Sequence, residues 1–390
     1  MSIEERRTPS MRSWPLWGEE EERNVLEALR SGFWGLGGKW AFEFARDFAR
    51  YCGCKRGVPC ANGTVALKVA LRAVGVGKGD RVVTSPYTFV STVSVIAELG
   101  AVPVLVDLIE NGLHMNPVEA SEIAEALDAK AVIPVHIMGM PSPMDELQHL
   151  MKSMDLAVIE DAAQAHGSER RGRRTGSLGT IGCFSFQSSK VMTAGEGGCL
   201  TTDRDDLADL CWSLINCGRT SEKDWYESDL LAYNYRMSEF QAAVLAAQLS
   251  RLDHQIEVRQ RNYRLLLEEL EDVDGIEPVR PPEGTTRFNV YTVPLRLERK
   301  RIGSVDKRHV VELLRSRGVP VSPGYTVPLH RHSGVVNYCA SLGIELTPLP
   351  NAEAAARDVL WIPHHAMLTD EERALQIADS LKEVIKNIIS

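Results

Sequence analysis

The sequence predicts an α/β protein with a mostly parallel sheet in a large domain and a smaller C-terminal α/β domain. The first observation is that short apolar runs alternate with segments of helical spacing between about residues 60 and 205. The second is a long segment without Gly or Pro, from about residue 238 to Glu271. The third is that strand and helix patterns resume after a stretch rich in Pro and Gly at 275–284. A chain of 390 residues is long enough for two such domains.

The strands of the large domain are expected in four short runs rich in Val, Ile and Leu, which are Val82–Thr84, Ala101–Val106, Ala131–Val135 and Leu156–Ile159. Segments whose apolar residues have helical spacing separate these runs. One buried helix face is indicated by Leu67, Ala70, Leu71 and Val74, and another by Ile123, Ala126 and Leu127. Continuous apolar strands that alternate with helices indicate a parallel sheet covered on both faces.

The segment that follows residue 238 is expected to be one long helix that leaves the first domain and reaches the second. Ser238 and Gln241 have the spacing of a capping box at its start. We therefore divide the chain into a large domain at 1–250, which includes the N-terminal segment, and a smaller domain at 251–390.

Three elements are expected in the smaller domain. The run Phe288–Leu297 alternates like a strand. A helix with one apolar face should stop at Gly318, as shown by Val310, Leu313, Leu314 and Arg317. The last helix should begin at Thr369, because Glu372 follows at capping-box spacing.

Composition excludes several classes of function. The formal net charge is −9, which argues against a nucleic-acid binder because phosphate contacts need a basic surface. A negative net charge is still compatible with a small anionic ligand bound at a local positive site. No stretch approaches the roughly 18 uninterrupted apolar residues of a membrane-spanning helix, and the N-terminal residues MSIEERRTPSMRSW lack the apolar region of a secretory signal. We therefore expect a cytoplasmic protein with no membrane partner.

The eight cysteines form no paired CxxC units, and their spacing matches no zinc site. Cys52, Cys54 and Cys60 are close enough in sequence to hold a metal. The expected reading is nevertheless reduced structural thiols and no metal, as is usual in a cytosolic enzyme.

The motif FSFQSSKVMTAGEGG at 184–198 contains the first candidate for chemistry. Lys190 follows a small polar pair and precedes a loop rich in glycine. A lysine amine can form an imine with an aldehyde cofactor. Ser185 could donate its hydroxyl to a phosphate. The alternative is a surface lysine before a hairpin loop.

The motif IEDAAQAHG at 159–167 places two carboxylates at the end of an apolar strand. Ligands of parallel sheets bind beyond the carboxyl ends of the strands. A carboxylate there can pair with a protonated pyridine nitrogen. We choose Asp161, because Glu160 should point to the opposite face of the sheet. The alternative is that Asp161 only caps a helix.

Two further motifs supply a phosphate site and an aromatic ring. In ANGTVALKVAL at 61–71, the start of a helix offers free N–H groups and the hydroxyl of Thr64, although an ordinary cap would look the same. In SPYTFVST at 85–92, either Tyr87 or Phe89 could stack on a pyridine ring, or both could belong to the core. All four motifs fall at loops of one predicted sheet, and together they predict a site for pyridoxal 5′-phosphate (PLP).

These motifs resemble those of the DegT/StrS family of PLP-dependent sugar aminotransferases, and the resemblance extends from about Trp14 to the C-terminal helix. It implies the PLP fold type I architecture, which is like that of aspartate aminotransferase, with the large domain binding PLP. It also implies that Lys190 holds the cofactor, that Asp161 contacts the pyridine nitrogen and that Gln164 lies beside the phenolic oxygen. Phe89 would stack on the ring, and the phosphate site would consist of Gly63, Thr64 and Ser185.

The resemblance further implies a homodimer in which each active site is built from both subunits. The segment YNYRMSEFQAA at 233–243 matches the one that reaches the partner's phosphate, with Asn234 as the first candidate contact and Arg236 as the second. On the substrate side, GYTVPLH at 324–330 would bring Tyr325 and His330 near the amino acceptor. Trp34 would lie at the mouth of the site.

Gln187 bears on the choice of substrate, because many members that act on nucleotide sugars have His at this position. The form with Gln is similar to the cyclitol aminotransferases that act on scyllo-inosose. It is also similar to the 3-amino-5-hydroxybenzoate synthases, which would add a dehydration. Lys190 argues against the dehydratase branch, which has His in its place.

The implied reaction is a ping-pong transfer from L-glutamine or L-glutamate to the ketone of a cyclitol or keto-sugar, with Lys190 as general base and acid. A nucleotide-sugar aminotransferase and a non-catalytic regulator of the same fold remain alternatives.

Overall fold

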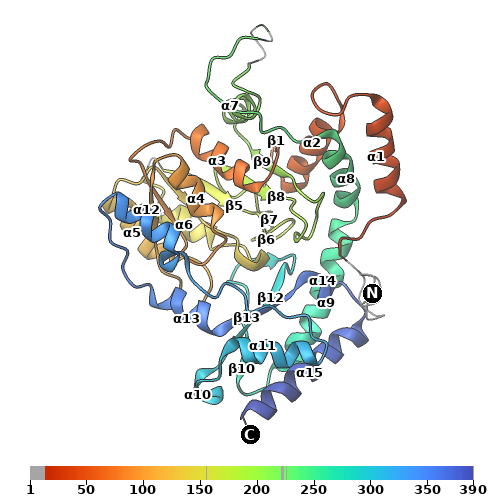
Figure 1. Ribbon diagram of the computed structural model, residues 1–390, viewed down its shortest axis with the longest axis vertical. Helices are drawn as coiled ribbons and strands as arrows, with labels where there is room; N and C mark the ends of the chain where they lie inside the picture. The colour runs from red at the N-terminus through yellow and green to blue at the C-terminus, as the bar shows by residue number, and fades with distance from the viewer. Residues whose placement is uncertain (1–13, 155, 221–223, 225, 390) are drawn as a thin grey trace.

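The computed structural model describes residues 14–154, 156–220, 224 and 226–389 (Figure 1). Its centre is a seven-stranded sheet in the order β1-β9-β8-β5-β4-β2-β3. The strands from β8 to β3 are parallel, whereas β9 runs antiparallel to both β8 and β1. Their bounds are β1 Arg56–Cys60, β2 Arg81–Thr84, β3 Val102–Leu105, β4 Ala131–Ile133, β5 Ala157–Asp161, β8 Ile181–Ser185 and β9 Gly198–Thr202. The prediction of a mostly parallel sheet is confirmed.

Helices cover both faces of this sheet (Figure 1). Successive strand residues explain why the predicted runs are continuously apolar: Val82 packs on one face and Val83 on the other, and both are fully buried. The first face is covered by α3 Gly63–Ala73, α4 Ser91–Glu98 and α7 Asp205–Ile215. The second face is covered by α2 Trp40–Cys52, α5 Pro117–Ala126, α6 Met144–Leu150 and α8 Glu239–Ser250. Helix α1, Glu19–Ser31, packs on α8.

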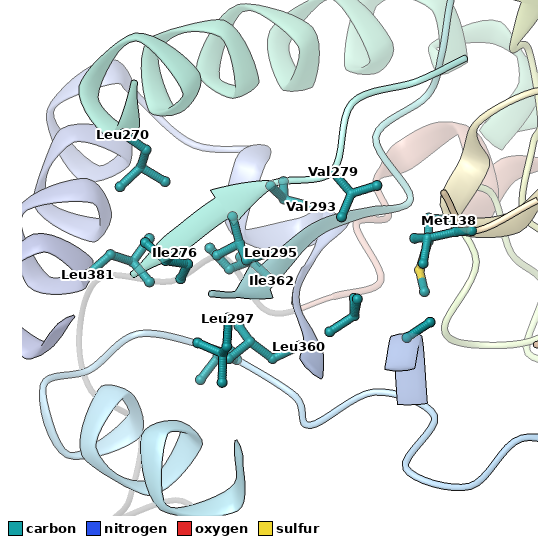
Figure 2. Close-up of a cluster of buried hydrophobic side chains, with 14 of the residues drawn as sticks. Met138, Leu270, Ile276, Val279, Val293, Leu295, Leu297, Leu360, Ile362 and Leu381 are labelled. Atoms are coloured by element: carbon teal, nitrogen blue, oxygen red, sulfur yellow. The ribbon is translucent and has the colours of Figure 1, made fainter. Parts of the chain in front are cut away.

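The C-terminal part is built on an antiparallel sheet in the order β10-β12-β13, with bounds Ile276–Pro278, Thr292–Leu297 and Val359–Pro363. Figure 2 shows its apolar core, in which Leu295 and Ile362 of the sheet lie near Leu270 and Leu381 of the helices. Met138 of the large sheet's loops belongs to the same cluster. The remaining helices are α9 Leu252–Leu270, α10 Arg299–Ile302, α11 Lys307–Ser316, α12 Ser333–Ser341, α13 Pro350–Asp358, α14 His364–Met367 and α15 Glu371–Ile389.

The two parts of the chain are joined by a small sheet and by α9. In the small sheet, β11 Thr285–Arg287 pairs with β6 Glu169–Arg170, which pairs with β7 Arg173–Arg174. Helix α9 begins in a cluster with α2 and α8 and ends in the C-terminal core, beside α15 (Figure 1). The division at residue 250 remains a prediction.

The expectation of one long helix after residue 238 is wrong. The capping box of Ser238 and Gln241 forms, but the helix ends at Ser250 and α9 starts at Leu252. Arg251 lies between them with φ −112° and ψ 2°, outside helical geometry. The break gives each half its own direction, so that α8 packs on α1 and α2 while α9 reaches α15.

Two smaller expectations also need correction. The strand predicted at Phe288–Leu297 begins only at Thr292, because Val290 has a left-handed backbone with φ 53°. The last helix is capped by Asp370 and not by Thr369, since the Asp370 side chain accepts a hydrogen bond from Arg373 N at 2.9 Å. In the described part of the chain, no helix combines the length and apolar character needed to cross a membrane.

Candidate active site

A cavity of about 590 Å³ lies beyond the carboxyl ends of β2, β5 and β8, where the C-terminal part adds Tyr291 and Tyr325. Many of the predicted site residues line it: Gly63, Thr64, Phe89, Asp161, Gln164, Ser185, Gln187, Lys190 and Tyr325. Apart from Tyr325, they come from separate segments at one edge of the large sheet, as the motifs predicted. Their individual roles stay predictions.

One end of the cavity is formed by the first turn of α3. The Asn62 side chain caps this helix by accepting a hydrogen bond from Val65 N at 2.9 Å. The first turn of a helix leaves N–H groups without intrahelical partners, and these favour an anion. Thr64 Oγ1 lies 2.8 Å from Ser91 Oγ, which adds two hydroxyls. A Cβ on Gly63 would come within 2.6 Å of Ser185 Cβ, so glycine is required for β8 to approach this closely.

Asp161 lies at the end of β5 with its carboxylate in the cavity wall. One oxygen accepts a hydrogen bond from Thr92 Oγ1 at 2.8 Å, and the other accepts one from Ala163 N at 3.3 Å. Burial raises the pKa of the Asp161 carboxyl, and the hydrogen bond from Thr92 and the charge of Lys190 oppose this rise. A cationic ring nitrogen would relieve the cost of keeping this carboxylate charged.

The adjacent carboxylate, Glu160, points to the other face of the sheet and is completely buried. One oxygen accepts hydrogen bonds from Leu178 N at 2.7 Å and Gly179 N at 2.6 Å. The other accepts from Gly176 N at 2.7 Å and from His136 Nε2 at 2.9 Å. Glu160 is therefore saturated with structural donors and does not face the cavity.

Lys190 follows a turn in which its own N–H donates to Gln187 O at 2.9 Å. Its ammonium nitrogen lies 4.9 Å from the centre of the Tyr291 ring. Among the residues that the structure describes, no hydrogen bond or ion pair holds this nitrogen. The amine thus faces the cavity without a competing partner. The Gln187 side chain is turned back, because its oxygen accepts hydrogen bonds from the N–H and the hydroxyl of Ser189.

The two aromatic candidates separate clearly. Phe89 lines the cavity with 59% of its surface exposed, whereas Tyr87 is fully buried against Tyr325 with ring centres 5.4 Å apart. Tyr87 therefore belongs to the core and Phe89 is free to contact a ligand. Gln164 is anchored by Met138 N, which donates to its oxygen at 2.8 Å, and its amide lies 3.4 Å from the Tyr325 hydroxyl.

Four predicted residues do not line this cavity. Trp34 is exposed and donates to Leu29 O. Asn234 is exposed, and Arg236 donates to Asn216 Oδ1 at 2.9 Å. His330 was expected beside the amino acceptor; its ring is buried and its Nε2 lies 3.0 Å from Glu353 Oε1, and its role stays a prediction.

Several lining residues were missed by the sequence reasoning, notably Ser91, Thr92, Ser189, Glu196 and Tyr291. A signal for the first two was present, since the motif SPYTFVST places their two hydroxyls directly after Phe89 and Val90. Tyr291 carried no such signal, because it comes from the C-terminal part of the chain.

The residues present fit PLP. The first turn of α3 with its hydroxyls suits the phosphate, Asp161 suits the pyridine nitrogen, and the unengaged amine of Lys190 suits the aldehyde. The fold is that of the PLP fold type I aminotransferases. The chain belongs to the DegT/DnrJ/EryC1/StrS aminotransferase family, whose model matches residues 15–382.

Comparison with known proteins gives relatives along nearly the whole chain. An L-glutamine:2-deoxy-scyllo-inosose aminotransferase from Streptoalloteichus tenebrarius is 36% identical, over 96% of this chain and 95% of that protein. A 3-amino-5-hydroxybenzoate synthase from Amycolatopsis mediterranei is 32% identical, over 97% and 98%. The crystal structure of a 3-amino-5-hydroxybenzoic acid synthase superposes with a TM-score of 0.89 at 28% identity, over 98% of this chain and 100% of that one.

Proposed function

We propose that this protein is a PLP-dependent aminotransferase that moves an amino group from L-glutamine or L-glutamate to the ketone of a cyclitol related to scyllo-inosose. The observation that carries the proposal is the arrangement of Lys190, Asp161 and the first turn of α3 around one cavity. The 36% identity to a cyclitol aminotransferase along nearly the whole chain supports the choice of acceptor.

When bound, PLP supplies an aldehyde that reacts with amines and a ring that accepts electrons. The residues of this chain would do the rest. The N–H groups of the first turn of α3 and the Thr64 hydroxyl bind the phosphate. Asp161 would pair with the protonated ring nitrogen, and Thr92 holds that carboxylate in place. Phe89, which lines the cavity, would cover the ring on one side.

Lys190 is the group that moves protons. Once an amino donor had displaced it from the cofactor, its amine would be placed in the cavity to take the proton from the donor's α-carbon and to return a proton later in the reaction. In the second half of the reaction, Lys190 would move protons in the opposite order while the acceptor ketone takes up the amino group. The Tyr291 ring, 4.9 Å from the lysine nitrogen, is placed to stabilise the charged amine between these steps.

The charges around the cavity favour an acceptor without a diphosphate. Among the described lining residues the cation is Lys190, which the cofactor engages, whereas Asp161 and Glu196 are acidic. A nucleotide sugar would bring two more negative charges to this wall. A neutral cyclitol avoids that repulsion, and this agrees with Gln187 in place of the His found in many members acting on nucleotide sugars.

We also propose that the enzyme is a cytoplasmic homodimer with shared sites. Asn234 and Arg236 lie outside the cavity of their own chain, as expected if they reach the phosphate in a second copy. Large apolar side chains such as Phe33, Tyr226 and Leu231 are exposed and would be covered by that copy. All eight cysteines are free, which suits a reducing compartment.

The proposal is tested by Lys190→Ala, with Lys130→Ala as the control because Lys130 is exposed and does not line the cavity. We expect Lys190→Ala to lose turnover and the visible absorbance of the covalently held cofactor, whereas Lys130→Ala retains both. Turnover and unchanged absorbance in Lys190→Ala would refute the assignment.

The acceptor is identified in a half-reaction screen. The enzyme in its pyridoxamine phosphate form is mixed with scyllo-inosose or with 3-keto and 4-keto nucleotide sugars. The return of the visible absorbance of the cofactor bound to Lys190 is then followed. Faster return with nucleotide sugars would select the nucleotide-sugar alternative. An aromatic product would select the 3-amino-5-hydroxybenzoate synthase alternative, and no turnover with any donor would select a non-catalytic regulator.

A further inference from the structure

The backbone just before Lys190 is held from three directions. The carbonyl groups of residues 187–189 each accept one hydrogen bond, from Lys190 N at 2.9 Å, Trp14 Nε1 at 2.8 Å and His364 Nε2 at 3.0 Å respectively. Trp14 precedes α1 and His364 begins α14, so donors from both ends of the chain meet on one short turn. The turn that carries the reactive amine is thus positioned by residues far away in sequence.

The His364 ring is fixed on several sides. It is buried, with 2% of its surface exposed. The Trp14 ring meets it edge-on at 4.5 Å, and the Tyr291 ring stacks on it at 6.0 Å with an angle of 17° between the planes. Its backbone N–H also donates to Tyr291 O at 3.0 Å. Because the Tyr291 ring lies near the Lys190 nitrogen, His364 contacts both the backbone and the aromatic neighbour of the lysine.

Arg259 determines which nitrogen of His364 carries the proton. Its Nη2 lies 3.4 Å from His364 Nδ1, and a guanidinium can only donate. Nδ1 must therefore accept, which leaves the proton on Nε2, where it is donated to Ser189 O. Burial, together with the positive charges of Arg259, His365 and Lys190, lowers the pKa of His364 well below its usual range. The ring therefore stays neutral at the pH of a working enzyme.

The burial of the Arg259 guanidinium is energetically unfavourable. The residue is fully buried, and burial lowers its pKa to about 9. Its Nε and Nη1 have no hydrogen-bond partner among the residues that the structure describes. Stability alone does not explain a buried cation with so few partners, because an apolar side chain of similar volume would usually serve the core as well.

We propose that His364 is a positioning residue for Lys190, and that Arg259 selects the tautomer in which it donates to the backbone beside the lysine. The inference rests on the proposed function to the extent that Lys190 is the reacting amine. An error of about 1 Å in the place of a reacting group can lower a rate about 100-fold, so a loosened turn would slow every step that the amine performs.

Two substitutions separate positioning from plain stability. In His364→Gln the amide nitrogen occupies the place of Nε2 and can still donate to Ser189 O. In His364→Asn the side chain is shorter and reaches only the place of Nδ1. Both introduce a polar amide into the same pocket, so their cost to the fold should be similar. His114→Asn is the matched control, because His114 is also buried and its Nε2 lies 2.9 Å from a carbonyl, that of Met140, away from the cavity.

The main readout is reconstitution of the cofactor-free full chain with PLP, in which the covalent capture by Lys190 is followed as visible absorbance. We expect His364→Asn to slow capture and to lower kcat by about tenfold or more, with KM for the amino donor within about twofold of wild type. We expect His364→Gln to stay within about threefold, and His114→Asn to capture PLP at the wild-type rate even if its Tm falls.

A third variant tests Arg259 separately. Arg259→Met removes the donor that fixes the tautomer and also removes a buried cation with few partners. We expect capture to be slowed by more than about threefold, without loss of Tm. This combination would not result from a merely structural role, in which rate and Tm would fall together.

The outcomes are distinguishable. Equal capture rates and kcat values in His364→Gln and His364→Asn would overturn the proposal, as would the same slowing in His114→Asn. If Arg259→Met captures PLP at the wild-type rate, Arg259 has no part in positioning Lys190. If the wild-type chain does not capture PLP, or if Lys190→Ala captures it equally well, the proposed function fails instead.

Discussion

Replacing Glu160 with glutamine is the sharpest test of the packing beneath the site. Its two oxygens each accept two hydrogen bonds, one pair from Leu178 N and Gly179 N and the other from Gly176 N and His136 Nε2. In Glu160→Gln one oxygen becomes an NH₂ group. Whichever way the amide is turned, that group faces two donors, and two buried N–H groups lose their acceptor.

His136 cannot resolve the conflict by changing its tautomer. Ser142 N donates to His136 Nδ1 at 2.9 Å, so a proton moved to Nδ1 would face another N–H group. Each buried donor left without an acceptor costs about 1–3 kcal/mol, so two cost about 2–6 kcal/mol. With an unfolding entropy of about 2.1 cal/mol/K per residue, or about 0.8 kcal/mol/K for 390 residues, Tm should fall by about 2–7 °C.

The assay is thermal unfolding followed by circular dichroism, with and without PLP. Glu125→Gln is the control, since Glu125 is exposed and lies on α5. We expect its Tm to match that of wild type. If Glu160→Gln also unfolds at the wild-type temperature, the hydrogen bonds assigned to Glu160 do not stabilise the fold and the reasoning is refuted.

Two further predictions concern charge. Asp161→Asn should lower kcat about 100- to 1000-fold with little change in Tm, because an amide cannot balance a cationic ring nitrogen; kcat per bound PLP is the measurement, and a loss below tenfold would contradict it. Burial lowers the pKa of His114 to about 4 and of His166 to about 3, whereas an unfolded histidine has a pKa near 6.5. The unfolded chain therefore binds more protons, and the free energy of unfolding should fall by about 2 kcal/mol per pH unit between about pH 6 and pH 4 from these two residues. The measurement is the free energy of unfolding in urea at several pH values across this range. In His114→Gln this free energy should change less steeply with pH, and an unchanged pH dependence would count against a buried, neutral His114.

The sequence predicted the central sheet well, because strands that are buried on both faces must be apolar at every position, as at Val82 and Val83. It did not predict the break at Arg251, because no Gly or Pro marks it. The break depends on which cluster each half of the segment meets, α1 and α2 for α8 and α15 for α9. Such a choice is made by tertiary packing and leaves no local pattern.

The difference between what a local sequence pattern predicts and what tertiary packing decides also applies to the site. The common location of Lys190, Asp161 and the start of α3 could be predicted, because each lies at or shortly after the end of a strand of the same sheet. Tyr291 and His364 could not, because they lie in the C-terminal part. The packing of its sheet brings Tyr291 into the cavity wall and His364 against the turn before Lys190. Their hydrogen bonds also involve backbone carbonyl groups, which no residue pattern identifies.

The two neighbouring carboxylates of β5, Glu160 and Asp161, differ in the number of hydrogen bonds that each accepts from the protein. This number distinguishes a structural carboxylate from one that can bind a ligand. A carboxylate offers about four lone-pair sites. Glu160 uses all four on protein donors, so it has no capacity for a ligand. Asp161 uses two, on Thr92 and Ala163, and its remaining sites face the cavity. It follows that Glu160→Gln should lower Tm and that Asp161→Asn should lower kcat, and an exchange of these two effects would show that the assignment of the pair is reversed.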